Sequence, residues 1–411
     1  MPKTFRMTLV DNLLITLAVV VASFALFQVP RNVDFLNPIG VVIEDLDVTD
    51  LAFSHFRNED RFAYDTNVVV VNIGASNRDR IAAIIENIAS CNPAVIALDV
   101  LLERDRDSAM DSRLVAAIRQ FPRFVMGIRV VASDDADDDD QVTTVRLPFF
   151  GTQTSASFGY CNLVTEGEDL VRTCRETSLL EVLDGDTVLS FALAATQLFD
   201  STATQRALAR GLPTETIHYV GNLESFTHVD VDDVDPLTSP SSVFRNKIVV
   251  IGYLGDHIGE VDLEDRFYTP LNGQYVGRGL PDMYGAVIHA NIISMVLRDD
   301  FVTTLQPWQN AILALILVIL NVFLFTTLYN RYEAWYDLLA LVLLALQSVL
   351  LLWITVWLFG SHLFKLDPTL SLFGIFLVGP IHDLYHDSLK KLARRFRIAM
   401  RRRLRTSPSK S

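Results

Sequence analysis

The sequence contains little cysteine, with three residues among 411, namely Cys91, Cys161 and Cys174. Three cysteines cannot form a framework of several disulfides, and they show neither a CxxC pair nor a His-rich zinc spacing. The GxSxG, HExxH and P-loop motifs of common hydrolases and nucleotide-binding enzymes are also missing from the sequence. We therefore predict a protein that is not an enzyme and that uses no metal and no cofactor.

Lysine and arginine are missing from four apolar runs of the sequence. Because about 20 mostly apolar residues cross a bilayer, these runs predict an α-helical membrane anchor of four spans. The absence of basic residues inside them argues against a transport pathway built on charges within the membrane. A cleaved signal peptide is the alternative for the first run, but no A-x-A cleavage site follows it. The runs are residues 13–29, 311–328, 338–359 and 370–381.

Positive charge is scarce between the first and second apolar runs. Residues 31–306 contain 21 Lys and Arg against 43 Asp and Glu, whereas residues 307–411 contain 12 against 5. The acidic segment would repel a phosphate backbone, which argues against nucleic acid as a partner. Basic residues lie near both ends of the chain, and such residues mark the cytoplasmic side of membrane proteins. Both termini are therefore predicted in the cytoplasm, with the acidic segment outside.

The acidic segment alternates apolar, β-branched runs with stretches that have apolar residues on one helical face. This alternation predicts an α/β fold whose mixed, largely parallel sheet is flanked by helices. The expected strands are 67–73, 94–98, 124–131, 216–220 and 247–251, and the expected helices are 78–89, 111–120, 190–199 and 281–298.

A β-hairpin is predicted where residues 159–163 and 170–173 flank an acidic turn. Counting outward from the turn places Cys161 opposite Cys174, within reach of a disulfide. A reduced cross-strand pair is the alternative. The acidic run 134–140 is interpreted as a solvated loop, because the spacing of an EF-hand calcium site is missing.

Seven short stretches of this sequence resemble, in the same order, those of the CHASE2 family of bacterial extracellular sensor domains. In that family an N-terminal span, the sensor domain and three further spans usually precede a cytoplasmic output domain. The resemblance implies a sensor in the bacterial inner membrane whose large domain is periplasmic. We find no output domain in this chain and expect a separate output protein. The stretches are DLAF (50–53), VVVVNI (68–73), ALDVL (97–101), FGYCNL (158–163), NKIVVIG (246–252), DRFYTP (265–270) and IHAN (288–291).

These observations divide the chain into five expected parts. They are a cytoplasmic N-terminus (1–12), a first transmembrane helix (13–29), a periplasmic sensor domain (30–306), a transmembrane module of three helices (307–387) and a basic cytoplasmic tail (388–411).

Seven residues are candidate ligand contacts. Ligands of open α/β sheets collect at the carboxyl ends of the strands, where Asn72, Asp99 and Gly252 are expected. The alternative is a structural role, since buried polar side chains usually serve only to complete hydrogen bonds. The resemblance to the family adds Asp265, Thr269, His289 and Asn291.

The tail and the outer domain suggest different partners. A juxtamembrane basic helix gains attraction to anionic lipid, which makes membrane lipids the first candidate for the tail. Apolar residues at a/d spacing between His382 and Ala399 leave a paired signalling helix, and with it a homodimer, as the alternative. For the outer domain we expect an unknown small ligand or protein; the alternative function is a docking subunit of an envelope complex that senses nothing. The lipid contacts are expected from Arg394, Arg395, Arg397, Arg401, Arg402 and Arg403.

Overall fold

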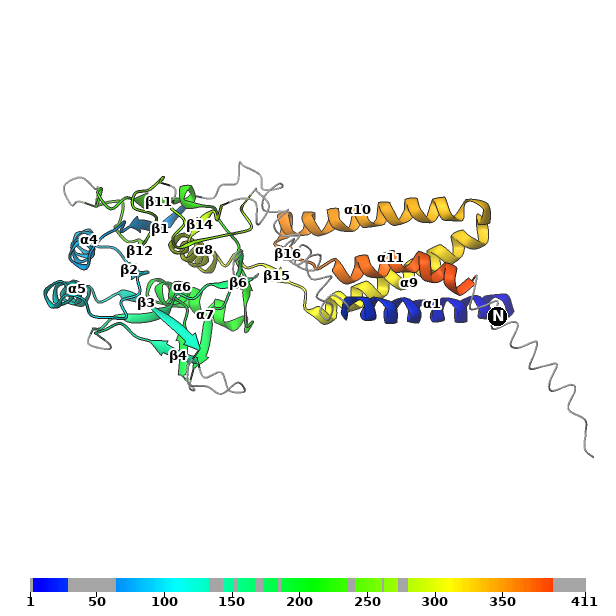
Figure 1. Ribbon diagram of the computed structural model, residues 1–411, viewed down its shortest axis with the longest axis horizontal. Coiled ribbons are helices and arrows are strands. Elements are labelled where there is room, and N and C mark those ends of the chain that lie inside the picture. Colours follow the sequence, from blue (N-terminus) through cyan, green and yellow to red (C-terminus); the bar gives the residue numbers. More distant parts are fainter. Residues whose placement is uncertain are drawn as a thin grey trace, which may run out of the picture. The chain divides into compact units, whose positions relative to one another are not determined.

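The protein consists of two compact units, which are considered separately (Figure 1). Phe53–Val302 form the α/β unit, and Met1–Ala52 with Thr303–Ser411 form the helical unit. The acidic run 134–140, the stretch at 50–53 and the tail with its six arginines lie outside the described residues. The computed structural model describes residues 3–28, 64–132, 143–150, 154–166, 173–183, 186–234, 241–260, 262–272 and 280–386.

A seven-stranded sheet is the centre of the α/β unit. All of its neighbouring strands pair in parallel except β3 and β4, so the predicted mixed, largely parallel sheet is confirmed. In order across the sheet the strands are β11 (Phe226–Val229), β1 (Asp65–Asn72), β12 (Ile248–Gly252), β2 (Val95–Leu98), β3 (Phe124–Ala132) and β4 (Thr143–Arg146), and β5 (Ser157–Tyr160) also pairs with β3.

The central strands are buried on both faces, as their continuous apolar runs predict. Residues 68–71 of β1 and 248–251 of β12 are at most 1% exposed. One face of the sheet packs against α4 (Arg78–Ser90) and α5 (Ser108–Gln120), and the other against α6 (Phe191–Phe199) and α8 (Gly285–Arg298). Figure 1 shows these helices as layers on either side of the strands. The three layers leave the carboxyl ends of the parallel strands together at one edge.

Side-chain hydrogen bonds fix where the helices of the first layer begin. Asn77 caps α4 by accepting from the backbone N–H of Arg80, and Asp107 caps α5 in the same way. A buried ion pair between Arg78 and Asp111 joins the two helices. Within the other layer, α7 (Ser201–Ala209) continues directly from α6 and is capped by Asp200.

The predicted hairpin forms with a different register, and this corrects the expected cysteine pair. Its strands are β6 (Val164–Glu166) and β7 (Thr173–Thr177), with Val164 opposite Glu176. Of the stretch expected as its first strand, Gly159 and Tyr160 pair instead with β3, as the end of β5. Cys161 therefore follows a strand of the main sheet and is not opposite Cys174, and no disulfide joins the two.

Short strand pairs account for the remaining differences from the prediction. The helix expected from Pro281 begins at Gly285, because Met283 and Tyr284 pair with a neighbouring strand. The strand expected at 216–220 is reduced to β10 (Glu215–Thr216), which pairs with β7. The further short strands are β8 (Leu180–Leu183), β9 (Asp186–Leu189), β13 (Arg266–Phe267) and β14 (Met283–Tyr284).

The described part of the helical unit contains four α-helices: α1 (Lys3–Gln28), α9 (Pro307–Arg331), α10 (Tyr336–His362) and α11 (Thr369–Leu384). Among the described residues, α9 and α10 are the two helices long and apolar enough to cross a membrane. The apolar part of α1, Leu9–Ala25, and α11 are shorter. Two of the four predicted spans thus meet the length requirement, and the other two stay predictions.

Small and polar residues bring three of these helices together. A Cβ on Gly374 of α11 would lie 2.5 Å from Cγ2 of Val318 in α9, so only glycine permits this approach. Thr326 of α9 donates a hydrogen bond to Asn12 of α1 over 2.8 Å. Tyr385, directly after α11, donates to Asp11 over 2.7 Å. A short parallel pair, β15 (Thr303–Thr304) with β16 (Phe364–Lys365), also lies in this unit.

Candidate functional site

Four chemically active side chains converge at the carboxyl edge of the sheet. Asp99 follows β2, and its backbone N–H still donates to the carbonyl of Ile251 over 2.8 Å. Cys161 follows β5 in the same way, donating to Ile128 over 2.9 Å. Strands of a parallel sheet end at one edge, which brings these two residues to the place where such folds bind ligands. His289 from α8 and Asp265 from the loop before β13 complete what we call the edge cluster.

Three members of the edge cluster lie within reach of a common centre. The side-chain donor atoms of Asp99, Cys161 and His289 are all within 4.8 Å of one another. Nε2 of His289 is 4.0 Å from Oδ2 of Asp99, and their side chains are only 3% and 12% exposed. The ring of Phe191 covers the imidazole, with centroids 5.0 Å apart. Within the described structure, Nδ1 of His289 is buried without a hydrogen-bond partner.

Two glycines make this convergence sterically feasible. A Cβ on Gly127 of β3 would lie 2.7 Å from Sγ of Cys161, closer than real contacts permit. A Cβ on Gly252 of β12 would lie 2.6 Å from Cβ of Ala286 and 3.5 Å from Cβ of Asp99. The role of Gly252 is therefore at least steric, since it lets α8 carry His289 close to the end of β2.

The edge cluster holds negative charge in poorly solvated surroundings. Burial, followed by the charges of Asp99 and Glu264, raises the pKa of the Asp265 carboxyl group to about 7, whereas Arg129 opposes this rise. Burial, followed by the charge of Asp99, raises the pKa of the Cys161 thiol well above its ordinary value. Burial lowers the pKa of His289 against the opposing influence of Asp99. At neutral pH the thiol and the imidazole are therefore uncharged beside two carboxyl groups.

Asp265 is the most exposed member of the edge cluster. Its residue surface is exposed although its carboxyl group is surrounded mostly by protein, and Asp99 and Cys161 are themselves partly exposed. Its backbone φ is +57°, in the left-handed region that aspartate tolerates better than most residues. Its carbonyl accepts from the N–H of Gly285, which ties the residue to the start of α8. An unusual backbone conformation at a charged, accessible position is typical of binding sites.

Comparison with known protein families identifies the chain. The model of the CHASE2 domain matches residues 22–325, which is most of the 411 residues. The chain belongs to the CHASE2 domain family. The match contains the whole α/β unit as the structure describes it, together with the edge cluster. Comparisons with curated proteins and with solved structures return no match.

Asn72 has all its polar atoms occupied by the CHASE2 domain itself. Its side-chain nitrogen donates to Asp230 over 2.8 Å and to the carbonyl of Gly255 over 3.0 Å. Its side-chain oxygen accepts from the backbone N–H groups of Gly74 and Leu254. Asn72 thus ties together the loops that follow β1, β11 and β12.

The side chains of Asn291 and Thr269, like that of Asn72, form hydrogen bonds with other residues of the domain. The side chain of Asn291 accepts from Val220 over 2.7 Å and donates to the carbonyls of Gly221 and Val287, each over 2.9 Å. Thr269 donates to Asp282 from its backbone over 2.9 Å and from its hydroxyl over 2.6 Å. Of the seven candidate residues, the structure gathers Asp99, Asp265, His289 and Gly252 at one place, and gives the other three partners elsewhere.

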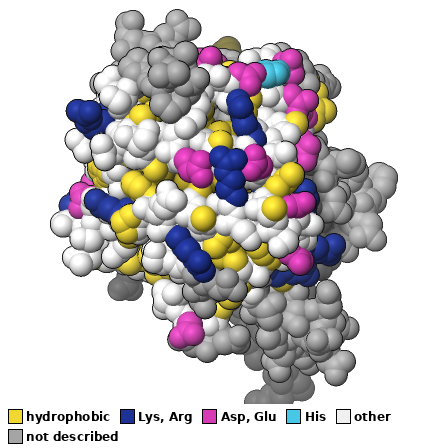
Figure 2. All heavy atoms as spheres, turned by 90° about the vertical axis from the view of Figure 1, so that its left-hand side faces the viewer, with side chains coloured by type: hydrophobic (Ala, Val, Ile, Leu, Met, Phe, Trp, Pro, Cys, Tyr) yellow, Lys and Arg dark blue, Asp and Glu magenta, His cyan; other side chains and the backbone are white. Residues whose placement is uncertain are grey.

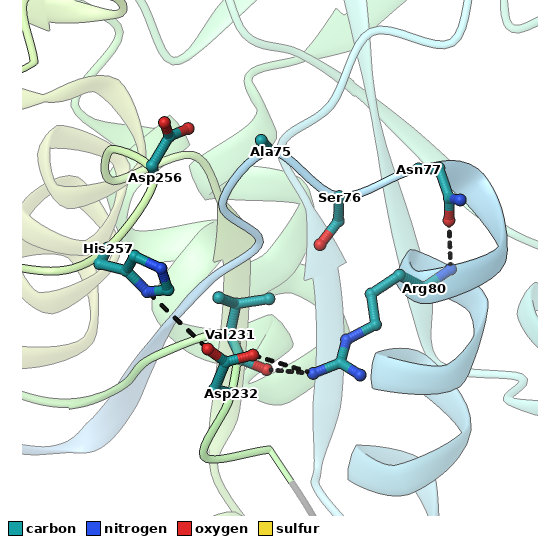
Figure 3. Close-up of a pocket in the computed structure, with 8 residues that line it drawn as sticks. All are labelled: Ala75, Ser76, Asn77, Arg80, Val231, Asp232, Asp256 and His257. Atoms are coloured by element: carbon teal, nitrogen blue, oxygen red, sulfur yellow. Dashed lines mark hydrogen bonds and ion pairs between the residues drawn. The ribbon is translucent and has the colours of Figure 1, made fainter.

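A hollow apart from the edge cluster lies at the carboxyl ends of β1, β11 and β12, and Figure 3 shows its lining. Its volume is about 500 Å³ and it opens widely to solvent. Arg80 donates to the carbonyl of Val231 and to Asp232, and His257 also lies 3.9 Å from Asp232. Arg80, Asp232 and His257 on this wall are therefore paired with one another. The lining residues are Ala75, Ser76, Asn77, Arg80, Val231, Asp232, Asp256 and His257.

Sequence reasoning missed Cys161 as a member of the site. The available signal was its position directly after an apolar strand, the same signal that selected Asp99. The hairpin prediction assigned residues 159–163 to another sheet, so Cys161 was matched with Cys174 instead. Gly127 was missed because a glycine inside a strand has no chemistry of its own, and its steric role depends on the neighbouring strand.

Proposed function

We propose that this chain is a membrane-anchored, periplasmic CHASE2-type sensor that acts through a separate output protein. The observation that carries the proposal is the edge cluster, in a domain whose family consists of sensor domains. Asn72 and Asn291 have their polar atoms occupied by the fold. By contrast, the buried Nδ1 of His289 has no hydrogen-bond partner in the described structure. Because a buried polar atom without a partner is costly, a bound small ligand or protein group would account for it.

The surface of the helical unit supports the membrane anchor. Apolar side chains along α9 and α10 are widely exposed, such as Phe323 at 65%, Leu341 at 65% and Val349 at 67%. Such surfaces are unfavourable in water and favourable in hydrocarbon. The core shared by α1, α9 and α11 favours insertion of all four helices. We propose four spans, cytoplasmic termini, and a basic tail at the inner surface of the bacterial inner membrane.

The state of the thiol supports binding over catalysis. A nucleophilic cysteine needs a lowered pKa, whereas burial and Asp99 raise the pKa of Cys161. His289 is neutral and lies among groups that do not activate the sulfur. We therefore propose that the edge cluster recognises a ligand and does not transform it.

The docking alternative would require a contiguous exposed apolar patch on the α/β unit. On the face drawn in Figure 2, hydrophobic side chains are interspersed with acidic and basic ones. The described large apolar side chains that are exposed in this unit come from separate segments, which favours the sensor. They are Tyr64, Leu147, Val182, Leu212, Leu263 and Leu280.

Quantitative co-purification tests the proposal. The full chain would be isolated from its native membranes in mild detergent, as wild type and as the double variant Asp99→Asn, His289→Gln. The matched control is His257→Gln, which changes a histidine of the hollow in Figure 3. We expect an output protein whose recovery changes in the double variant and not in the control. The same co-purifying proteins in the same amounts from all three would overturn the sensor proposal.

A further inference from the structure

The donor atoms of the edge cluster indicate the chemistry of its ligand. They are a carboxylate oxygen, a sulfur and an imidazole nitrogen, contributed by three separate elements that converge on one point. Calcium and magnesium prefer oxygen ligands, and sulfur with nitrogen selects transition metals of the zinc class. Organic ligands are usually bound in pockets with mostly apolar walls, which these three groups do not provide.

We infer that Asp99, Cys161 and His289 bind one zinc ion. The role of the zinc ion rests on the proposed sensor function, because zinc would be the ligand of the proposed sensor site. Three protein ligands would leave the fourth zinc position open to water or another ligand, unlike the closed four-ligand set of structural zinc sites. Asp99 and Cys161 are partly exposed, which would let an ion enter from solvent.

The observed distances are close to those of a zinc site. Zinc lies about 2.0 Å from nitrogen and oxygen ligands and about 2.3 Å from sulfur, so tetrahedral ligands are about 3.3 to 3.6 Å apart. Nε2 of His289 and Oδ2 of Asp99 are 4.0 Å apart, and no pair of donor atoms exceeds 4.8 Å. Contraction by about 1 Å, within reach of side-chain rotation, would complete the site. The separation of 4.0 Å is also too long for a hydrogen bond, so these two groups do not satisfy each other.

Burial and charge make this position suitable for a cation. His289 is 2% exposed, its Nε2 faces Oδ2 of Asp99 without a hydrogen bond between them, and acidic groups outnumber basic ones around the edge cluster. A divalent ion would compensate the carboxylates that now repel each other. Binding would replace the proton of Cys161, because the thiolate is the zinc ligand, and one proton would leave to solvent for each ion bound.

Cobalt is the probe for the test, because Co²⁺ occupies zinc sites and gives a thiolate charge-transfer absorption when sulfur is a ligand. The purified full chain in detergent would be stripped with a chelator and titrated with Co²⁺, and then with Zn²⁺. We expect the absorption to saturate at one Co²⁺ per chain and to disappear when Zn²⁺ displaces it. A spectrum without thiolate absorption at saturating Co²⁺ would overturn the inference.

Single substitutions test whether Cys161, and not another cysteine, supplies the sulfur ligand. Cys161→Ser should abolish the absorption, and His289→Gln should weaken binding by more than about 100-fold, since loss of an outer partner already costs 10–100-fold. Cys91→Ser is the matched control, because Cys91 is a buried cysteine at the end of α4. Binding that survives Cys161→Ser and is lost with Cys91→Ser would contradict the assignment.

A measurement on the wild-type chain tests the zinc site without any variant, so its result does not depend on whether the variants fold. Zn²⁺ should slow alkylation of Cys161 by a maleimide at least tenfold, as measured by mass spectrometry of the peptide that contains it. Mg²⁺ at the same concentration should leave the rate unchanged. Equal rates with and without Zn²⁺ would refute the site. The co-purification test above requires no added metal, so failure of the zinc inference and failure of the sensor proposal are seen separately.

Discussion

Gly127→Ala probes the position of the Cys161 thiol, on which the account of the edge cluster depends. The new Cβ would lie 2.7 Å from Sγ of Cys161 and 3.2 Å from the carbonyl oxygen of Leu98. The first contact is about 1 Å too short for non-bonded heavy atoms, so the thiol must move. Overpacking of this kind costs about 1 to 3 kcal/mol of unfolding free energy.

Removing the sulfur should relieve most of that cost. Cys161→Ala alone is expected to cost about 1 kcal/mol, from the loss of one buried group of methylene size. In the double variant the added methyl group occupies space that the thiol has left, and only the contact with the Leu98 carbonyl remains. We expect a coupling free energy of about 1 to 2 kcal/mol between the two substitutions, since residues in contact are not additive.

Hydrogen exchange of the full chain in detergent, across a urea series, is the suitable assay. Amides of β2 and β12 would report the unfolding free energy of the α/β unit. Tryptophan fluorescence would not, because the four tryptophans, at positions 308, 335, 353 and 357, all belong to the helical unit. An additive double variant, with coupling below about 0.5 kcal/mol, would refute the placement of Cys161 beside β3.

Gly159→Ala is the matched control for this cycle. Its Cβ would lie 2.6 Å from Cα and 2.9 Å from the backbone nitrogen of Phe191, neither of which can rotate away. The variant should destabilise the α/β unit, and Cys161→Ala should not rescue it. Rescue of both glycine variants would indicate a general effect of the cysteine substitution instead of a local one.

Three further predictions follow from the same geometry. Asn291→Ala should cost about 2 to 4 kcal/mol in the exchange assay, because it leaves buried backbone groups of residues 220 and 221 without partners; a loss below 1 kcal/mol would contradict the structural role. Burial raises the pKa of Asp282 to about 6, so the proton-bound form favours folding below pH 4 and that stability is lost as the pH rises through 6. Thr269→Val removes a hydroxyl donor to the ionised carboxylate, so it should destabilise more at pH 7 than at pH 5, and equal losses would count against it. A tail peptide should bind anionic vesicles in a salt-dependent manner and lose this binding when five arginines become glutamine, whereas equal binding to neutral vesicles would favour a protein partner; the five are Arg394, Arg395, Arg401, Arg402 and Arg403.

The sheet was predictable because each central strand has a local signal. Residues 68–71 and 248–251 are apolar and β-branched, and strands buried on both faces require such runs. The helix at 78–90 has both its apolar face and the Asn77 cap in the sequence. The predicted start of the last helix was wrong because strand pairing overrides local preference there. Met283 and Tyr284 form β14 and pair with β13 instead of forming a first helical turn.

The edge cluster was predictable only in part, because it is assembled by contacts between distant segments. Asp99 could be found from its place after a strand, and Asp265 and His289 from the family stretches. Cys161 could not be assigned without knowing that β5 pairs with β3, since the same residues also suit a hairpin. Whether an asparagine binds a ligand or holds a loop depends on loops more than 60 residues away, as the partners of Asn291 at positions 220 and 221 illustrate.

Accessibility of two engineered cysteines tests the sensor account most directly, because a periplasmic sensor requires its α/β unit outside the inner membrane. Ser155 is exposed in the α/β unit, and residue 407 belongs to the basic tail. Ser155→Cys and Ser407→Cys would be made separately in a Cys161→Ser chain, and cells with a permeabilised outer membrane would be treated with a membrane-impermeant maleimide. We predict labelling at position 155 in intact cells and labelling at position 407 only after the inner membrane is broken. Labelling of both positions from the same side would contradict the account.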